Sequence, residues 1–293
     1  MNNEAAATDA STSAATAAFD RLQISDETSK DDVAESPAAP SILDGKSDVS
    51  APIILCDAFY GFPTQKRPRN ERVRAVSRQL MNFLQWRSET SQKNSNNHHS
   101  NVHVLGENKD IEEVKTRVEE LGTQLEVSAE EVMFHPDVEI HKFLEKRKGP
   151  KEEVVYLSPD ATYTLPTTCR PPKILIVGML IDRRITEDRS RRRAEETLDI
   201  RAAKLPLDEL CVKELSSNEP LNVDTVMELI QRWWWNCDEL EERLQLLKES
   251  SKIEGDNKEK YSRLYKKCFI EAAAFAMKTQ RDRHPNRTVH KTD

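Results

Sequence analysis

One apolar run constrains the fold of this chain more than any other feature. Residues 174–181 read ILIVGMLI, eight consecutive residues without a charged side chain. A helix that spans a bilayer needs about 20 such residues, so the run is too short to cross a membrane. A strand that is apolar on both faces is typical of the interior of a parallel sheet. The run therefore predicts a central strand of a parallel β-sheet.

Other short apolar segments alternate with helical patterns, in which apolar side chains recur every three to four residues. Predicted strands cover residues 52–57, 102–105, 153–157, 173–180 and 202–205. Predicted helices cover residues 70–86, 109–122, 128–147, 189–199, a segment that begins after Asn222, 237–250 and 257–280. This alternation predicts an α/β fold with a mostly parallel sheet and helices on both of its faces.

Glycine is scarce, and its spacing excludes two common phosphate-binding sites. The chain has seven glycines, and no two of them are closer than 16 residues. The GxGxxG and GxxxxGK[ST] patterns, which cradle phosphates with closely spaced glycines, are therefore absent. This excludes a P-loop NTPase and argues against an ordinary Rossmann dinucleotide site.

The negative charge belongs to one end of the chain. The formal net charge is −7, but residues 1–50 alone contain three basic and ten acidic side chains, so the remainder is balanced. Residues 1–50 also lack the large apolar side chains that could offset the entropy lost on ordering. We expect a disordered acidic tail over residues 1–50, a folded domain over residues 51–280 and a basic tail over residues 281–293.

The cysteines and the first residues bear on the compartment. The five cysteines are far apart and form no CxxC pair, which favours a reducing compartment and argues against a metal site such as structural zinc. The first 20 residues contain no Lys or Arg and no apolar core of a signal peptide. We therefore expect a nuclear or cytoplasmic protein.

Two aspartates follow predicted strands. Asp57 ends the strand PIILCD, and Asp182 follows the apolar run. Ligands of open parallel sheets bind at the carboxyl ends of the strands, where a partly desolvated carboxylate gains a raised pKa and can act as a base. The alternative is that each aspartate only caps a turn or a helix.

Basic side chains cluster after both aspartates. Residues 61–90 contain seven bases and two acids, and residues 183–193 contain six bases and two acids. Arginines in such clusters can bind phosphates through paired hydrogen bonds, although a solvated helix surface has the same composition. Gln79 lies on the apolar border of its predicted helix. It is either a hydrogen-bonded polar group at the edge of the core or a group that orients a ligand near the sheet. Residues 233–235 are three consecutive tryptophans, a candidate surface on which nucleic-acid bases could stack. Consecutive helix residues point in different directions, so we expect Trp234 to pack in the core and the other two to be partly exposed.

Six segments in order resemble a known family. They are PIILCD, SRQL, VVYLSPD, KILIVGMLIDRR, AAKLPLDEL and LNVDTVMELI, and they span about residues 52–250. The chain resembles the tRNA (purine-N1)-methyltransferases of the SPOUT superfamily, which act at tRNA position nine. The resemblance implies S-adenosylmethionine as cofactor, a C-terminal trefoil knot, and tRNA as substrate with guanine favoured. We also expect a monomer.

The resemblance also assigns roles to residues by their motif positions. Asp182 matches the general base, and Asp57 and Gln79 match positions near the substrate base. Cofactor-lining positions are Leu157, Gly178, Met179, Leu205, Pro206 and Leu221. Expected tRNA-backbone contacts are Arg183, Arg184, Arg191, Arg192 and Arg193.

The chain departs from the family pattern at three points. Met179 replaces the second glycine of the VGG motif, LPLDEL lacks the usual tyrosine, and Asp224 stands where asparagine is common. The branch that includes the methyltransferase subunit of mitochondrial protein-only RNase P also varies at this glycine. An alternative is therefore a catalytically weak or inactive RNA-binding scaffold, such as a mitochondrial tRNA-processing subunit with a protein partner.

Overall fold

The computed structural model describes six stretches of the chain. These are residues 51–91, 99–147, 153–180, 188–207, 221–249 and 258–283, all within the compact unit Val49–Asp293. The predicted tail over residues 1–50 lies outside the described residues, and so do Asp182, Arg183 and Arg184. The trefoil knot stays a prediction, because residues 181–187 and 208–220 also lie outside them.

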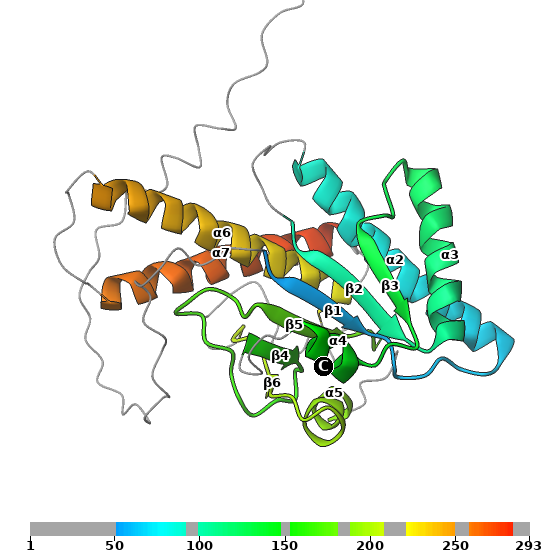
Figure 1. The fold of residues 1–293 in the computed structure, drawn as a ribbon. Helices are drawn as coiled ribbons and strands as arrows, with labels where there is room; N and C mark the ends of the chain where they lie inside the picture. Colours follow the sequence, from blue (N-terminus) through cyan, green and yellow to red (C-terminus); the bar gives the residue numbers. More distant parts are fainter. Residues whose placement is uncertain are drawn as a thin grey trace, which may run out of the picture. The chain divides into compact units, whose positions relative to one another are not determined.

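The sheet has six strands, and every pairing between neighbours is parallel. The strands are β1 (Ile53–Asp57), β2 (Asn101–Gly106), β3 (Val132–Pro136), β4 (Val154–Leu157), β5 (Ile174–Gly178) and β6 (Ala202–Ala203). Their order is β3-β2-β1-β5-β4-β6, so the apolar run forms β5 in the interior of the sheet (Figure 1). The prediction of a central strand in a parallel sheet is confirmed.

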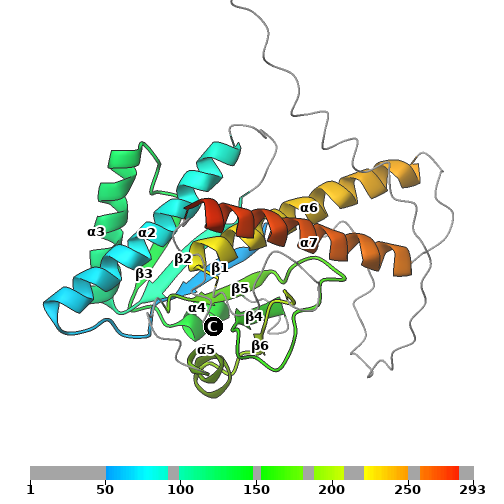
Figure 2. The same ribbon diagram turned by 180° about the vertical axis from the view of Figure 1, so that it is seen from behind.

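Helices cover both faces of the sheet, as predicted. Four long helices share one core with it: α2 (Lys66–Ser91), α3 (Asn108–Leu125), α6 (Val223–Glu249) and α7 (Lys258–Arg283). The other face carries α4 (Ile140–Lys146), α5 (Arg189–Arg192) and a single π-helical turn, η2 (Arg193–Thr197). Figure 2 shows the face with the long helices. We call the first face the α6 face and the second the α5 face.

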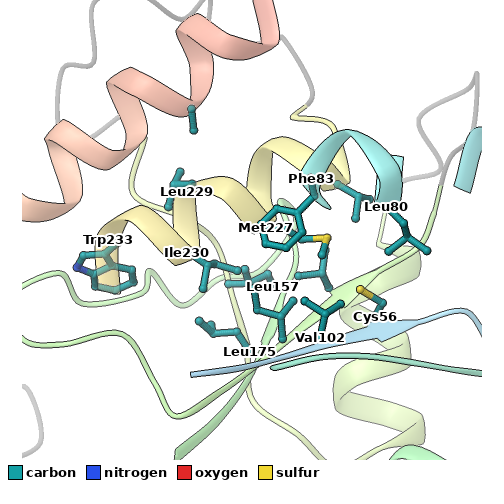
Figure 3. Close-up of a cluster of buried hydrophobic side chains, with 14 of the residues drawn as sticks. Cys56, Leu80, Phe83, Val102, Leu157, Leu175, Met227, Leu229, Ile230 and Trp233 are labelled. Atoms are coloured by element: carbon teal, nitrogen blue, oxygen red, sulfur yellow. The ribbon is translucent and has the colours of Figure 1, made fainter. Parts of the chain in front are cut away.

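Alternation along the strands builds the two cores, because successive side chains of a strand point to opposite faces. Ile54 and Cys56 of β1 pack into the core of the α6 face, whereas Leu55 between them packs into the core of the α5 face. Figure 3 shows part of the first core, where Met227 of α6 and Leu157 of β4 are among the buried side chains. The last residues of each strand therefore also divide between the two faces.

One predicted helix is wrong. The segment 128–147 contains the edge strand β3 and the short helix α4 instead of a single helix. Only the first residue of β3, Val132, is buried, so the three apolar residues at 132–134 do not show the pattern of a core strand. Its pairing partner is β2, in the register Val102↔Val132, and local periodicity contains no information about that distant strand.

Two other boundaries differ from expectation. One helix, α6, runs without interruption through residues 233–235, where two helices were expected, and α7 continues to Arg283. Trp234 is buried as predicted and Trp235 is partly exposed, but Trp233 is completely buried and meets the ring of Phe269 edge-on at 5.1 Å. Two of the three tryptophans are thus unavailable as a stacking surface for bases.

Candidate functional site

The carboxyl ends of the strands bring several predicted site residues to one edge of the sheet. Asp57 and Gly178 are paired in register at the ends of β1 and β5, and the backbone N–H of Met179 donates to the carbonyl oxygen of Asp57 at 2.8 Å. Leu157 ends β4 beside Val177 of β5. Ligands of parallel sheets bind at this edge, so it is the candidate site.

The predicted residues divide between the two faces at this edge. Asp57 and Gly178 lie on the α5 face with Tyr156, whereas Leu157 and Met179 lie on the α6 face. The structure therefore brings together two separate groups, one polar and one apolar. A single surface that contains all the predicted residues does not form among those described.

Asp57 is the centre of the polar group. Its side chain is completely buried, and Arg193 donates to both of its carboxylate oxygens, from Nε at 2.7 Å and from Nη2 at 3.3 Å. The hydroxyl of Tyr156 donates to Oδ2 at 3.0 Å, and the backbone N–H of Phe59 donates to Oδ1 at 3.0 Å. We call Asp57, Tyr60, Tyr156 and Arg193 the Asp57 cluster.

The surroundings of the Asp57 cluster determine which tyrosine hydroxyl donates to which oxygen. Burial, followed by the charge of Asp57, raises the pKa of Tyr156 well above its ordinary value. Tyr156 therefore stays protonated and donates to Asp57, so its oxygen accepts the hydroxyl of Tyr60 in a short hydrogen bond. The carboxylate of Asp57 is thus paired with Arg193, and both of its oxygens already accept hydrogen bonds within the protein.

Gly178 gives the two tyrosines the space that they need. A Cβ atom at this position would lie 3.0 Å from the hydroxyl oxygens of both Tyr60 and Tyr156. The missing side chain is thus explained by the Asp57 cluster on the α5 face. The predicted role of Gly178 in lining a cofactor stays a prediction.

Three of the arginines in the basic segment after β5 form contacts within the protein. The guanidinium of Arg189 donates to the carbonyl oxygen of Tyr60 at 2.9 Å, and that of Arg193 is paired with Asp57. Arg191 forms an ion pair with Asp188 at 2.8 Å. Arg192 is exposed. Contact with RNA stays a prediction for these arginines.

The apolar group on the α6 face consists of residues from three successive strand ends. Leu157 and Met179 are buried, and Leu205, two residues after β6, packs against the same core. Met179, which departs from the family pattern, has a side chain only 1% exposed. Its bulk therefore lies within the core, so the substitution does not place a side chain in open space at the sheet edge.

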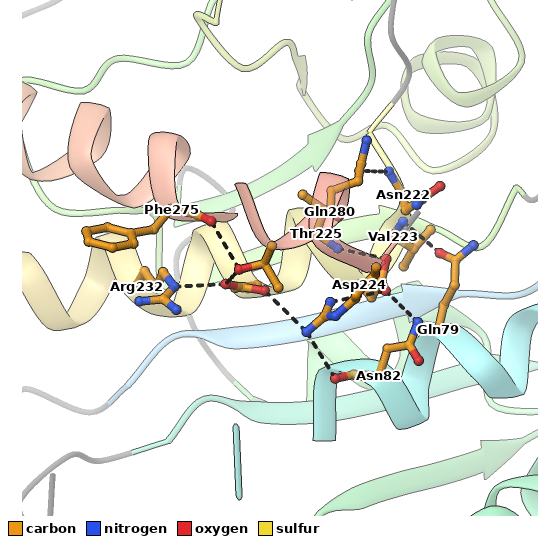
Figure 4. A network of polar contacts seen from close by, with 12 residues as sticks. Gln79, Asn82, Asn222, Val223, Asp224, Thr225, Arg232, Phe275 and Gln280 are labelled. Atoms are coloured by element: carbon orange, nitrogen blue, oxygen red, sulfur yellow. Dashed lines mark hydrogen bonds and ion pairs between the residues drawn. The ribbon is translucent and has the colours of Figure 1, made fainter. Parts of the chain in front are cut away.

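Next to these loops, α6 begins in a network of side chains from three helices (Figure 4). Oε1 of Gln79 on α2 accepts the backbone N–H of Val223 at 2.7 Å, and Oε1 of Gln280 on α7 accepts the N–H of Asn222 at 2.9 Å. Gln79 is thus a hydrogen-bonded polar group at the edge of the core, which is one of the two roles predicted for it. Leu221, predicted to line the cofactor, is the preceding residue and is half-buried.

Two buried carboxylates on α6 complete this network. Arg283 at the end of α7 forms ion pairs with Asp224 at 3.3 Å and with Glu228 at 3.6 Å. Asn82 donates to Asp224 at 2.9 Å, and Arg232 donates to Glu228 at 2.9 Å. We call the whole set the α6-start network: Gln79, Asn82, Asp224, Glu228, Arg232, Thr279, Gln280 and Arg283.

Sequence reasoning did not find several residues of these two groups. Tyr156 carries a weak signal, because alternation in β4 directs it to the same face as Asp57 in β1. Gln280 and Arg283 carry none, because they lie on a polar helix end about 60 residues from the backbone and carboxylate that they contact.

A protein-family model matches this chain over most of its folded part. The model described as tRNA (guanine(9)-N(1))-methyltransferase TRM10/TRM10A matches residues 77–246, which is more than half of the chain. The matched segment contains the carboxyl ends of β4, β5 and β6 and the start of α6.

Two curated proteins are similar over shorter stretches. A tRNA (guanine(9)-N1)-methyltransferase of Schizosaccharomyces pombe is 33% identical over 91 residues, 31% of this chain and 29% of that protein. A tRNA methyltransferase 10 homolog B of Danio rerio is 43% identical over 65 residues, 22% of this chain and 20% of that protein. The chain thus matches less than a third of the length of these relatives.

Two solved structures are also similar. The complex of full-length spTrm10 with SAH is 20% identical, with a TM-score of 0.45 over 77% of this chain and 98% of that one. The dual-specific Trm10 of Thermococcus kodakaraensis is 15% identical, with a TM-score of 0.42 over 62% of this chain and 90% of that one.

Proposed function

This chain belongs to the tRNA (guanine(9)-N(1))-methyltransferase family, and from that premise we propose that it methylates N1 of the purine at position nine of tRNA, with guanine preferred. The membership confirms the resemblance noted in the sequence. The observation that carries the proposal is the match over residues 77–246, because it spans the strand ends and the start of α6 at which the candidate site lies.

The apolar group on the α6 face fits the proposed cofactor, S-adenosylmethionine, which supplies an electrophilic methyl group. An adenosine binds in a mostly apolar slot with a few polar groups. Leu157, Met179 and Leu205 are apolar residues at or just after three adjacent strand ends, Pro206 directly follows Leu205, and Leu221 lies two residues before α6. We propose that these residues hold the cofactor.

Asp182 is the proposed general base. N1 of guanine carries a proton, which must leave as the bond from N1 to the methyl carbon forms. We propose that the carboxylate of Asp182 accepts this proton, while the electrons of the broken sulfur–carbon bond stay on sulfur. The other predicted aspartate, Asp57, is paired with Arg193 inside the protein, which leaves its carboxylate engaged.

Basic side chains in the segments that follow β1 and β5 support tRNA as the substrate. The helix α2 begins shortly after the carboxyl end of β1, and its first turns line a hollow of about 540 Å³ with Lys66, Arg67, Asn70, Glu71 and Arg74. The basic helix α5 begins shortly after the carboxyl end of β5. We propose that both segments contact phosphates, in which case affinity for tRNA falls steeply as salt rises.

The experiment that tests this function is methylation of tRNA transcripts bearing guanine or adenine at position nine, with the full chain and S-adenosylmethionine. We expect N1-methylguanine at position nine. Asp182→Asn should lower the rate by at least about 100-fold, the usual contribution of a general base. Asp199→Asn is the matched control, because Asp199 has φ of 52°, a conformation that asparagine also adopts. Equal rates for the two variants would remove Asp182 as the base.

The scaffold alternative is separated from the enzyme by cofactor binding. A scaffold binds tRNA without measurable affinity for S-adenosylhomocysteine, and calorimetry measures that affinity directly.

We further propose a monomer in the nucleus or cytoplasm, with mitochondrial location and a protein partner as the alternative. Within the described residues, none of the helices combines the length and the apolarity needed to span a bilayer.

A further inference from the structure

We propose that Gln280, on the C-terminal helix α7, is a positioning residue for the cofactor side of the site. It holds the backbone at the start of α6, next to Leu221, in the geometry that binding requires. This inference rests on the proposed function, because Leu221 is assigned to the cofactor by that function. The helix α7 begins at Lys258, beyond the matched residues 77–246, so the family match says nothing about it.

The first step is the hydrogen-bonding need of a helix start. The first backbone N–H groups of a helix have no partner within the helix and must find one elsewhere. At the start of α6, two neighbouring N–H groups are satisfied by glutamine side chains from two other helices. Gln79 of α2 accepts the N–H of Val223, and Gln280 of α7 accepts that of Asn222.

The second step is burial. Gln280 is only 3% exposed, so water cannot easily replace its oxygen at the N–H of Asn222. The N–H of the half-buried Asn222 would lose this acceptor, and a donor left without its acceptor carries a desolvation cost. The backbone would then have to move to recover a partner, and Leu221 would move with it.

The third step is that Gln280 is itself held from both sides. Thr279 before it donates to Glu228 of α6 at 3.0 Å. Arg283 after it forms an ion pair with Asp224 of α6 and donates to the backbone oxygen of Asn82 on α2 at 3.4 Å. The last turn of α7 is thus anchored to two helices, and Gln280 holds Asn222 against a fixed support (Figure 4).

The test uses Gln280→Met, which keeps the length of the side chain and removes the accepting oxygen. We expect the dissociation constant of S-adenosylhomocysteine, measured by calorimetry on the full chain, to rise about tenfold, in line with the loss of one hydrogen bond to the backbone. We also expect KM for S-adenosylmethionine to rise while kcat at saturation changes less than about twofold, the pattern of lost uniform binding. Amide exchange at Asn222 should accelerate.

The control is Cys268→Ala, a change at a buried position of α7 about three turns before Gln280. It perturbs the same helix without touching the start of α6. If this variant weakens binding as much as Gln280→Met at an equal loss of thermal stability, the effect is general destabilisation and the proposal is overturned. Wild-type affinity and unchanged exchange at Asn222 in Gln280→Met would also overturn it.

The outcome separates this inference from the proposed function. A wild-type chain that binds no S-adenosylhomocysteine would refute the function and the role of Gln280 together. A wild-type chain that binds it, with a Gln280→Met variant that binds it equally well, would refute only the role of Gln280.

Discussion

The Asp57 cluster and the α6-start network both keep carboxylates inside the protein, on opposite faces of one sheet. Among the described residues, Asp57 pairs with one cation, Arg193, and its other hydrogen bonds come from neutral donors. In the α6-start network one cation, Arg283, is shared by Asp224 and Glu228, and Glu228 has a second partner in Arg232. The first group depends on a single ion pair, whereas the second has overlapping contacts.

This difference shows how the two groups should respond to mutation. A buried carboxylate that loses its only cation leaves an uncompensated charge, which costs more than the pair contributed. A carboxylate that keeps a second cation, as Glu228 keeps Arg232 without Arg283, loses less. We therefore expect the α5 face to be the more sensitive of the two to the loss of one arginine.

The largest expected effect is that of Arg193→Met. It leaves the completely buried Asp57 without a cation, so the free energy of unfolding should fall by about 3 kcal/mol, as for other broken buried pairs. Urea unfolding measures this loss. The exposed neighbour Arg192 provides the control Arg192→Met, and equal losses in the two variants would show that the ion pair with Asp57 is unimportant.

Arg283→Met should have the second largest effect. Asp224 keeps its contact with Asn82, and Glu228 keeps Arg232 and Thr279, so we expect a loss of about 2 kcal/mol, smaller than that of a pair broken completely. The exposed Arg281 on the same turn gives the control Arg281→Met. A loss larger than that of Arg193→Met would reverse the comparison between the two faces.

The sequence predicted what depends on local pattern. The apolar run of residues 174–181 identified a central strand, because a strand buried on both faces needs apolar residues throughout. Asp57 was placed at the carboxyl edge, because it directly follows an apolar strand. The edge strand β3 was missed for the opposite reason: most of its residues are partly exposed, and its pairing with β2 is not local.

The partners of the site residues could not be predicted in the same way. Asp57 and Arg193 are 136 positions apart, and Asn222 and Gln280 are 58 apart. Their meeting depends on how α5 and α7 pack against the rest of the domain. The sequence therefore identified Asp57 and Gln79 as notable but did not reveal that one is neutralised by an arginine and the other caps a helix.

Gly178→Ala tests the packing of the Asp57 cluster with a smaller expected effect. The added methyl would lie 3.0 Å from two tyrosine hydroxyls, so the tyrosines must shift, at a cost of about 1 kcal/mol. Thermal unfolding measures it. Tyr60→Phe removes one of the two close hydroxyls, so the same glycine change should cost less in that background. An equal cost in both backgrounds would place the strain elsewhere.

The smallest expected effect concerns the pH dependence of the α6-start network. Burial raises the pKa of Glu228 above its ordinary value, although Arg232, Arg283 and Thr279 oppose the shift. A carboxyl group with a raised pKa holds its proton in the folded protein over a pH range in which the unfolded chain has already released it. Stability therefore falls as the pH rises through that range, starting from the ordinary pKa of a glutamate.

Glu228→Gln removes this titration, so the variant should lose less stability than the wild type as the pH rises from 4.5 to 7. The difference should be under about 1 kcal/mol, because Arg232, Arg283 and Thr279 oppose the burial cost. Urea unfolding across this pH range measures it, with Glu242→Gln at an exposed position of α6 as the control for a lost carboxylate. A wild-type slope in Glu228→Gln would mean that Glu228 is fully compensated by its cations. The carboxylate of Glu228 would then be compensated by Arg232 and Arg283, as that of Asp57 is by Arg193. The two faces would differ only in the number of cations that compensate each carboxylate.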